Sequence, residues 1–388
     1  MSLPDGWDVK KLGDVCDVIA GQSPQGIYYN NQEDGLPFYQ GKKEFTEKYI
    51  GEPVKWTTKI TKKADKDDIL MSVRAPVGPI NFATQKICIG RGLASIRAGK
   101  LIDKEFLYNF LLKHENEIIG NTGAVFNSIN KTQIGAIQIP LPLLDEQQRI
   151  IEVLDKAFTA IDKAKQNAEQ NLRNAKELFE SYLSEIFENH DLTWKVKALG
   201  EIAKHSLGKM LDKNKNKGIK KKYLRNQSVR WFDFDLDGLT EMRFLDNEKE
   251  RYTAIKGDVL ICEGGYPGRA AIWQNDYPIY FQKAIHRVRF SESVYGQWFL
   301  YYLFLSDRTG KLKLYFTGTG IQHFTGASLD KFIIPIPPIN VIKILITKID
   351  NISSETKKLE SIYQQKLDNL TELKKSILQK AFAGELTQ

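Results

Sequence analysis

The sequence predicts an α+β protein of two similar domains, joined by two long antiparallel coiled-coil helices and related by pseudo-two-fold symmetry. Three observations support this prediction. The chain of 388 residues contains an internal duplication, each copy ends in a long stretch of heptad periodicity, and the remainder consists of short β-like runs. At roughly 150 residues per domain, the length leaves room for two domains and two helices.

The duplication is the observation on which the other predictions depend. Three pairs of segments match between the copies, at offsets that drift from 187 to 195 residues: Trp7–Asp14 with Trp194–Glu201, Lys66–Leu70 with Lys256–Leu260, and Ile139–Pro142 with Ile334–Pro337. A unit of this size is a duplicated domain, not a solenoid repeat. We place the first domain at residues 1–142, the first long helix at 143–190, the second domain at 191–338 and the second long helix at 339–388.

Heptad periodicity follows the proline pair of each copy. Apolar residues recur there at steps of three and four, the spacing of a coiled-coil seam. Helices of about 40 residues would each span about 60 Å. Because an apolar stripe of this length must be buried, we expect the two helices to pack on each other. Two separate amphipathic helices, each on its own domain, are the alternative. We assign helix or partner packing to Ile151, Leu154, Phe158, Ile161, Leu172, Ile349, Ile352, Leu359, Leu370, Leu373 and Ile377.

Short β-like runs separated by Gly, Pro and Asn clusters fill both domains. We predict strands at 15–20, 69–73 and 87–97 in the first copy, and at 259–262 and 279–289 in the second. One helix is expected in each copy, at 103–113 and at 295–306. Pro140 and Pro142 cannot lie inside the first long helix, and Asp145 suits its N-cap.

Sequence motifs of enzymes and metal sites are missing. The segment 314–320 resembles a methyltransferase S-adenosylmethionine loop, but its counterpart in the first copy lacks the pattern and no catalytic Asn/Asp-Pro-Pro-aromatic motif occurs. The run Asp233–Gly238 opens like an EF-hand, but Phe244 takes the position that needs a bidentate Glu. No P-loop, HExxH or GxSxG pattern occurs. We therefore expect no catalytic residue, no metal site and no cofactor of the chain's own.

Composition points to an anionic partner. No apolar run reaches the roughly 18 residues of a membrane span, and the N-terminus lacks the apolar core of a secretory signal. Cys16, Cys88 and Cys262 lie far apart without CxxC spacing, so we expect a reducing cytoplasm without disulfides or zinc. The formal net charge of +8 favours a nucleic-acid partner.

A basic segment in the second copy suits DNA. Residues 209–225 carry eight Lys or Arg and one Asp, and polar residues follow directly. Lysines neutralise phosphates, whereas Arg, Asn and Gln make bidentate contacts to guanine and adenine. A solvated lysine loop is the alternative. The candidates here are Lys209, Lys213, Lys221, Arg225, Asn226, Gln227 and Arg230, together with Arg269 and the turn residues Gln322 and His323.

The first copy offers comparable residues at matching places. Its Gly-containing turn at 121–127 corresponds to the turn at 317–323, and this recurrence favours a shared role over two unrelated loops. The candidates are Gln40, Lys42, Lys43, Arg74, Arg91, Asn127 and Lys131. The frame residues match between copies while these loop residues differ, so we expect two recognition surfaces that read a two-part asymmetric DNA site with an unread gap. A free-standing nucleic-acid-binding protein and an unrecognised enzyme stay open at this point.

Taken in order along the whole chain, the motifs closely resemble the specificity subunit of type I restriction–modification enzymes. One departure is that Asn340-Val-Ile-Lys343 stands where the first copy has Asp145-Glu-Gln-Gln-Arg149. The resemblance rests on Leu3-Pro-Asp-Gly-Trp7, Leu12-Gly-Asp14, Ile139–Ile150, Tyr223-Leu-Arg-Asn226, Thr317-Gly-Thr-Gly320, Pro335-Ile-Pro-Pro338 and the ending Ile377–Leu386.

This resemblance implies a non-catalytic subunit with two target-recognition domains, each reading half of a bipartite site in double-stranded DNA. The coiled coil would act as a ruler and dock two methyltransferase (modification) subunits for adenine methylation. A restriction/translocase subunit would complete a complex for phage defence. S-adenosylmethionine, ATP and magnesium would then belong to the partner subunits.

Overall fold

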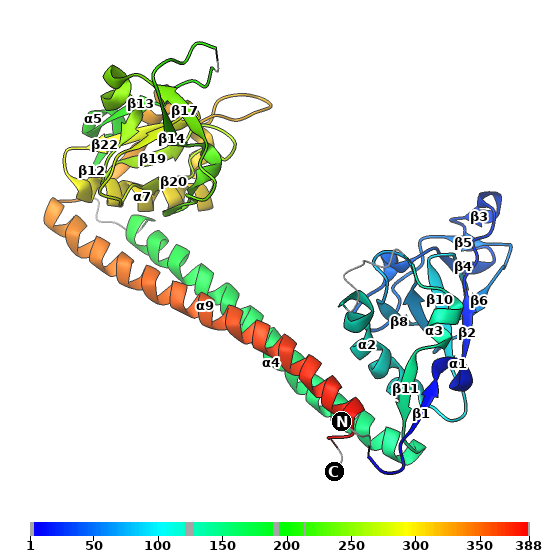
Figure 1. The fold of residues 1–388 in the computed structure, drawn as a ribbon. Coiled ribbons are helices and arrows are strands. Elements are labelled where there is room, and N and C mark those ends of the chain that lie inside the picture. The colour runs from blue at the N-terminus through cyan, green and yellow to red at the C-terminus, as the bar shows by residue number, and fades with distance from the viewer. Residues whose placement is uncertain (1–3, 121–127, 189–193, 213, 387–388) are drawn as a thin grey trace. The chain divides into compact units, whose positions relative to one another are not determined.

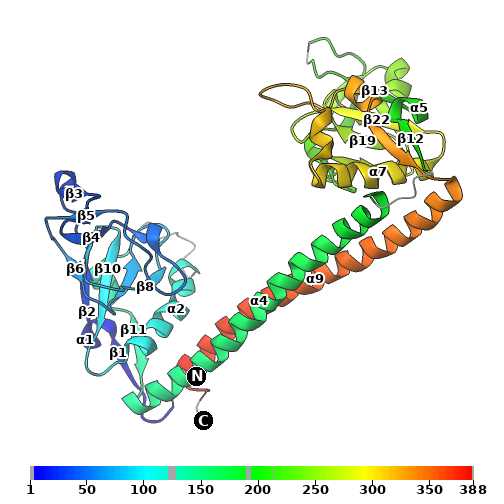
Figure 2. The same cartoon turned by 180° about the vertical axis from the view of Figure 1, so that it is seen from behind.

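The computed structural model describes residues 4–120, 128–188, 194–212 and 214–386 (Figures 1 and 2). The chain divides into two compact units. The first comprises Met1–Glu169 with Gln365–Gln388, and the second comprises Gln170–Gln364. Each unit holds one α+β domain and a segment of each long helix, so that α4 (Leu144–Glu188) and α9 (Ile339–Ala383) contribute to both.

The first unit contains short strands, short 3-10 turns and one longer helix. Its strands form a ribbon β1-β11, a four-stranded sheet β2-β10-β7-β8 and a five-stranded sheet β3-β5-β4-β9-β6. The elements are β1 (Asp8–Lys11), α1 (Leu12–Val15), β2 (Cys16–Ala20), η1 (Gly26–Tyr28), β3 (Tyr29–Asn30), β4 (Leu36–Tyr39), η2 (Lys42–Glu44), β5 (Trp56–Thr57), β6 (Lys63–Ala64), β7 (Ile69–Ser72), β8 (Ile80–Phe82), β9 (Ile87–Ile89), β10 (Leu93–Ala98), α2 (Lys104–Gly120), α3 (Lys131–Gly135) and β11 (Gln138–Leu141).

The second unit repeats this plan. Its ribbon is β12-β23, its four-stranded sheets are β13-β22-β19-β20 and β17-β14-β21-β18, and β15 pairs with β16. The elements are β12 (Lys195–Ala198), α5 (Leu199–Ile202), β13 (Ala203–Leu207), β14 (Ile219–Leu224), η3 (Asn226–Ser228), β15 (Val229–Arg230), β16 (Asp233–Phe234), β17 (Glu241–Phe244), η4 (Asp246–Glu248), α6 (Lys249–Tyr252), β18 (Thr253–Ala254), β19 (Val259–Cys262), β20 (Ala270–Ile272), β21 (Ile279–Phe281), β22 (Ile285–Phe290), α7 (Ser293–Arg308), η5 (Lys311–Tyr315), α8 (Gly326–Asp330) and β23 (Ile333–Ile336).

These elements confirm the predicted α+β class and its duplication, with one correction to the strands. The two longest predicted runs, 87–97 and 279–289, are each two strands. The break after β9 follows from Gly90, because a Cβ there would lie 2.9 Å from the Cα of Gln40. The chain therefore crosses another segment at this point and leaves the ladder.

An ion pair between a buried aspartate and an arginine recurs in two corresponding four-stranded sheets, β2-β10-β7-β8 of the first unit and β13-β22-β19-β20 of the second. Arg97 donates from Nε to Oδ1 of Asp68 at 2.8 Å, and Arg289 donates from Nε to Oδ1 of Asp258 at 2.6 Å. A second bond from Nη2 to Oδ2 completes each pair, at 2.8 and 2.6 Å. The side chains of Asp68 and Asp258 are only 3% and 2% exposed, so each carboxylate relies on its arginine for charge compensation.

Each unit pairs the beginning of one long helix with the end of the other, which is the antiparallel pairing that the heptads predict. In the first unit, the ammonium of Lys374 lies 4.8 Å from the ring centroid of Phe158 and 3.9 Å from Asp162. In the second unit, Phe187 near the end of α4 shares a hydrophobic cluster with Ile342 near the start of α9.

The seam contains most, but not all, of the residues that the heptads assign to it. Ile151, Leu154, Ile161 and Ile349 are buried, and Phe158, Leu172, Ile352, Leu370 and Ile377 are half-buried. Leu359 and Leu373 are 37% and 46% exposed, so they do not fill the seam between the helices, and packing against a partner is the part of their assignment that stays a prediction. Thr356, which breaks the apolar pattern, is buried instead, because its hydroxyl donates to the carbonyl of Ile352 at 2.9 Å.

The helix of each domain packs against the long helices of its own unit. In the first unit the rings of Phe106 and Phe382 lie 5.1 Å apart between centroids, and in the second those of Trp298 and Phe187 lie 4.4 Å apart. Asp145, expected as the N-cap of α4, lies in its first turn. Among the residues that the structure describes, no helix combines the length and apolar character needed to cross a membrane.

Candidate nucleic-acid interface

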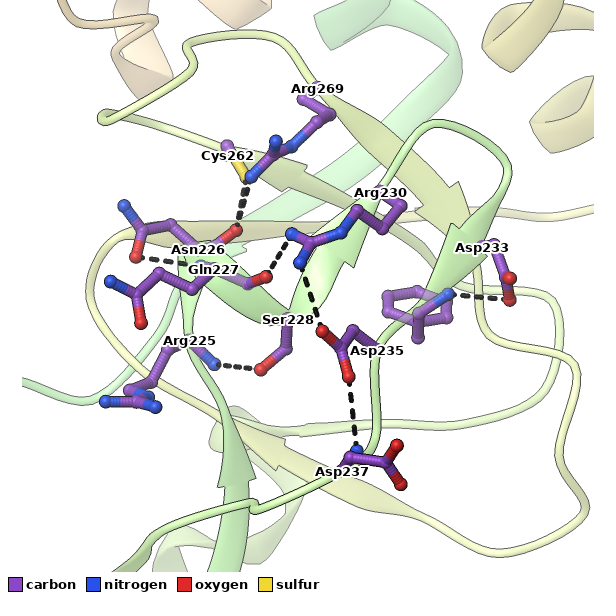
Figure 3. A network of polar contacts seen from close by, with 11 residues as sticks. Arg225, Asn226, Gln227, Ser228, Arg230, Asp233, Asp235, Asp237, Cys262 and Arg269 are labelled. Carbon is purple, nitrogen blue, oxygen red and sulfur yellow. Dashed lines mark hydrogen bonds and ion pairs between the residues drawn. The ribbon is translucent and has the colours of Figure 1, made fainter. Parts of the chain in front are cut away.

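The backbone ladders show which positions of the two domains correspond. Tyr39 ends β4 in a parallel ladder with β9, and Leu224 ends β14 in a parallel ladder with β21. Gln40 and Arg225, the next residues, therefore leave their sheets at the same point, just before the turns η2 and η3. Gln40 is exposed and Arg225 is half-buried, and Figure 3 shows the Arg225 guanidinium directed away from the side chains around it.

The turn after Arg225 is held by Asn226. Its Nδ2 donates to the carbonyl of Gly264 at 3.1 Å, and its Oδ1 accepts from the N–H of Gln227 at 3.0 Å. Its own carbonyl accepts from Nη2 of Arg269 at 2.9 Å (Figure 3). Asn226 and Arg269 therefore use several of their hydrogen-bonding groups to hold the surrounding loops together. In this structure they are positioning residues.

Arg230 clamps the other side of the same turn. One Nη donates to the carbonyl of Gln227 and the other pairs with Asp235 at 3.0 Å (Figure 3). The Arg269 guanidinium lies 5.2 Å from the ring centroid of Tyr266, which adds a cation–π contact to the first side. Two arginines thus hold η3 in place while the exposed side chain of Gln227 stays at the surface.

A short hairpin reaches the same place from the other end of the domain. The backbones of Thr317 and His323 exchange two hydrogen bonds of 2.9 Å, and Gln322 and His323 are exposed. A Cβ on Gly264 would lie 3.1 Å from Nδ1 of His323, so the hairpin rests against the loop to which Asn226 bonds. The structure therefore brings together six of the predicted residues of this copy: Arg225, Asn226, Gln227, Arg230, Arg269 and His323.

The predicted lysines of the second copy differ in where they lie. Lys221 lies on β14, whose first four residues are all exposed, and faces Met242 in the antiparallel ladder with β17. This strand presents a row of ammonium groups suited to a phosphate backbone. Lys213 lies outside the described residues.

Lys209 requires a correction, because the protein uses its charge internally. Its side chain is only 9% exposed, its ammonium pairs with Glu248, and it donates to the carbonyl of Arg243 at 3.0 Å. Burial acts to raise the pKa of Glu248, but the hydrogen bonds from Lys209 and Leu245 outweigh it and the pKa lies below its ordinary value. The prediction that Lys209 contacts DNA is therefore wrong, and the residue stabilises the loop before β14.

The candidates of the first copy gather around Gln40. Oε1 of Gln40 accepts from the hydroxyl of Ser23 at 3.0 Å, and Oγ of Ser23 accepts from the N–H of Arg91 at 3.2 Å. Lys42 and Lys43 lie in η2 directly after Gln40, and both are exposed. These four predicted residues therefore share one surface of the first domain.

Arg74 and Lys131 lie at the edge of that surface. Arg74 is exposed and pairs through its backbone with Ser128, which precedes α3. Asn130 caps α3 by accepting from the N–H of Gln133 at 2.9 Å, and this cap places the exposed Lys131 at the first position of the helix. Asn127 lies outside the described residues.

One exposed residue that the sequence analysis missed is Lys283, which takes the place of Arg91. Gln282, before Lys283, donates its N–H to the carbonyl of the last residue of β14 at 3.1 Å. Gly90, before Arg91, donates its N–H to the carbonyl of the last residue of β4 at 2.8 Å. The signal was present in the duplication, since Gln282-Lys283 follows Ile279–Phe281 as Gly90-Arg91 follows Ile87–Ile89. The glycine in one copy and the glutamine in the other disguise the match.

The chemistry of these surfaces is that of hydrogen bonding and charge. Cys16, Cys88 and Cys262 are buried and free, and burial raises the pKa of Cys16 to about 12 and that of Cys262 to about 11, so these two thiols stay protonated. Within the described ranges, no group of three or more His, Cys, Asp or Glu side chains is placed to hold a metal ion. What the two surfaces offer is cationic and amide groups on loops above a rigid sheet, an arrangement suited to a polyanion with readable edges.

Comparison with known proteins adds to this geometry. Residues 4–170 and 192–380 match the family model of the type I restriction modification DNA specificity domain. The putative type I restriction enzyme MjaX specificity subunit of Methanocaldococcus jannaschii is 42% identical over 179 residues, which cover 45% of this chain and 41% of that protein. The EcoKI specificity subunit of Escherichia coli is 24% identical, with 99% of this chain and 90% of that protein covered.

Solved structures share the fold over the whole chain. A chain from work on complex assembly and conformational transition of the type I R-M system has a TM-score of 0.83 and 19% identity, with both chains covered completely. The HsdS subunit of Thermoanaerobacter tengcongensis has a TM-score of 0.63 and 19% identity, covering 100% of this chain and 99% of that one. The alignments with MjaX and with the MjaIX specificity subunit span only 41% and 54% of those relatives.

Proposed function

The chain belongs to the family of type I restriction–modification DNA specificity domains, and from this premise we propose that it is the DNA-reading subunit of such a complex. Each domain reads one half of a bipartite site, and the helices between them set the gap. The observation that supports this proposal most strongly is the difference between residues at equivalent positions on the two domains. Gln40 stands where the second domain has Arg225, and Arg91 stands where it has Lys283.

The chain makes two kinds of contact with DNA, one to phosphates and one to bases. The ammonium groups of β14, together with Lys42 and Lys43, neutralise phosphates and hold the register without reading sequence. Arg225 and Gln40 stand at the exit of the parallel ladder, where a guanidinium suits guanine and an amide suits adenine. Because these two side chains prefer different bases, the two halves of the site differ.

The chain acts without chemistry of its own. Two methyltransferase subunits dock on it and methylate adenine, and a restriction/translocase subunit joins the complete complex. S-adenosylmethionine, ATP and magnesium bind to those partners, and the complex works in the cytoplasm as a defence against phage. The exposed apolar side chains of the long helices, among them Leu359, Leu373 and Ile344, offer partner subunits a surface that the seam leaves uncovered.

Methylation sequencing of the source genome, with and without this gene, tests the proposal. The expected result is loss of adenine methylation at one motif made of two short parts with a fixed unread gap. Unchanged methylation, or loss at a continuous motif, would contradict it and favour a free-standing nucleic-acid-binding protein. Methyl transfer to DNA by the purified chain alone, with S-adenosylmethionine, would contradict the non-catalytic role.

A further inference from the structure

Glu263 is a carboxylate set into the basic surface of the second domain. It directly follows β19, and its backbone is fixed from two sides. Its N–H donates to the carbonyl of Ala284 at 2.9 Å, and its carbonyl accepts from the N–H of Phe324 at 2.8 Å. The second bond joins Glu263 to the residue that follows His323. Gly264, which follows Glu263, accepts a hydrogen bond of 3.1 Å at its carbonyl from Nδ2 of Asn226. Glu263 is therefore surrounded by the turns that carry the candidate base contacts.

The first domain holds an apolar residue at the same position. The N–H of Val73 donates to Gly92 at 3.0 Å, and its carbonyl accepts from Ile129 at 3.0 Å, which repeats the two anchors of Glu263. Val73 is half-buried, as Glu263 is. Since valine fits this backbone position, the fold itself does not need a carboxylate there.

The Glu263 carboxylate lacks the internal partners that other acidic groups of this surface have. Asp235 pairs with Arg230, whereas no hydrogen bond or ion pair joins the Glu263 side chain to another residue in the part of the chain that the structure describes. Burial raises the pKa of Glu263, and the charges of His323 and Lys283 act against this rise. Lys283 and His323 therefore lie near the Glu263 carboxylate without bonding to it.

An unpaired, half-buried carboxylate on a DNA-facing surface has an electrostatic cost and a specific use. It repels phosphates, so it weakens binding to every sequence that does not compensate it. Among the groups on base edges in the major groove, the donors are the exocyclic amino groups of cytosine and adenine, and a glutamate accepts best from cytosine N4.

From this geometry we infer that Glu263 is a specificity-determining residue, which accepts a hydrogen bond from the exocyclic amino group of one base in the half-site of the second domain. This inference rests on the proposed function and deepens it. On the strand that it contacts, the carboxylate rejects guanine and thymine, because their major-groove edges present acceptors without an amino donor and would leave it unpaired. Lys283 nearby neutralises backbone phosphates, which keeps the DNA near enough for the contact.

The test compares methylated motifs in cells whose only copy of the gene encodes the wild-type chain, Glu263→Gln or Glu263→Val. Wild type is expected to require one particular base pair at a position of the half-site in which Arg225→Ala also relaxes a position. In E263Q this requirement should weaken by roughly tenfold or more, with the rest of the motif unchanged. E263V, which copies the first domain, should do the same. Glu292→Gln, an exposed glutamate before α7, is the matched control and should leave the motif intact.

Several outcomes would overturn the inference. The first is an unchanged motif in E263Q and E263V, and the second is a change confined to the half-site that Arg225→Ala leaves intact. Loss of all methylation in both variants would mark Glu263 as a structural residue. A wild-type chain that directs no bipartite methylation would instead refute the proposed function, so the two failures are distinguishable.

Discussion

The sheets β2-β10-β7-β8 and β13-β22-β19-β20 are alike in their interior and unlike at their rim. Asp68 with Arg97 and Asp258 with Arg289 form the same two hydrogen bonds between the same atoms. Beyond the ends of the strands the pattern diverges, since Val73 corresponds to Glu263. The sheet fixes the position at which a loop leaves, whereas the side chains of the loop can differ between the domains. This separation is what allows one fold to present two different recognition surfaces.

A second contrast lies inside the domains. His205 and His286 of the second domain stand at the ladder positions of Val18 and Ala94 in the first. His286 is only 2% exposed, and Nε2 of the neighbouring His205 lies at hydrogen-bond distance, 2.9 Å, from Oδ1 of Asp330. Burial, together with the neighbouring His205, lowers the pKa of His286 to about 4. The second domain thus has a titratable group where the first has only apolar side chains.

The largest effect is expected from the shared aspartate–arginine pair. Asp68→Ala and Asp258→Ala should each lower the free energy of unfolding by about 3 kcal/mol, because each removes a buried carboxylate together with its two charge-assisted hydrogen bonds to arginine. Hydrogen exchange during urea unfolding should locate each loss in the domain that carries the substitution. Asp276→Ala is the control, since the pair of Asp276 with Lys256 is exposed and should contribute under about 1 kcal/mol. Unequal losses in the two domains would break the proposed equivalence of the sheets.

Acid should destabilise the second domain more than the first. The folded pKa of His286 is about 4, below its ordinary value of 6.5, so the unfolded chain takes up the proton first. The contribution is fully present above pH 6.5 and is lost as the pH falls towards 4, by about 3 kcal/mol in all. His286→Ala, which copies Ala94 of the first domain, should flatten this part of the pH profile. A slope that persists in this variant would assign the acid sensitivity to other groups.

Arg225→Ala should reduce affinity for the cognate site by roughly tenfold to a hundredfold, because one bidentate base contact is lost. Binding of the complete methyltransferase complex to cognate and scrambled duplexes measures this, and the scrambled duplex should lose far less. Arg251→Ala, an exposed arginine on α6, serves as the control. Equal loss on both duplexes would reduce Arg225 to a phosphate contact and weaken the contrast with Gln40.

Lys221→Ala should have the smallest effect. Affinity should fall to a similar extent for all sequences, and the slope of log affinity against log salt should decrease by about one, as expected for one phosphate contact. Titrations of the same complex between low and moderate salt provide the measurement. A change in sequence preference would show that β14 reads bases as well as phosphates.

The sequence predicts the duplication, the two long helices and the α+β class because these depend on periodicities spread over many residues. It does not predict the burial of Lys209, because the partner Glu248 lies 39 residues away and the neighbouring lysines are exposed. The sequence also fails to predict that Thr356 lies in the seam and Leu359 outside it. Thr356 can be buried there because its hydroxyl bonds to a carbonyl of its own helix. Pairings between loops, such as Asn226 with Gly264, follow from the sheet register and leave no local pattern.

The methylated motif compared among wild type, Gln40→Ala and Arg225→Ala tests the central claim most directly. If each domain reads one half of a bipartite site, Q40A should relax a position in one half only and R225A a position in the other half only, with the gap unchanged in both. Relaxation of the same half by both variants, or a change in the gap, would contradict the account of two independent recognition surfaces.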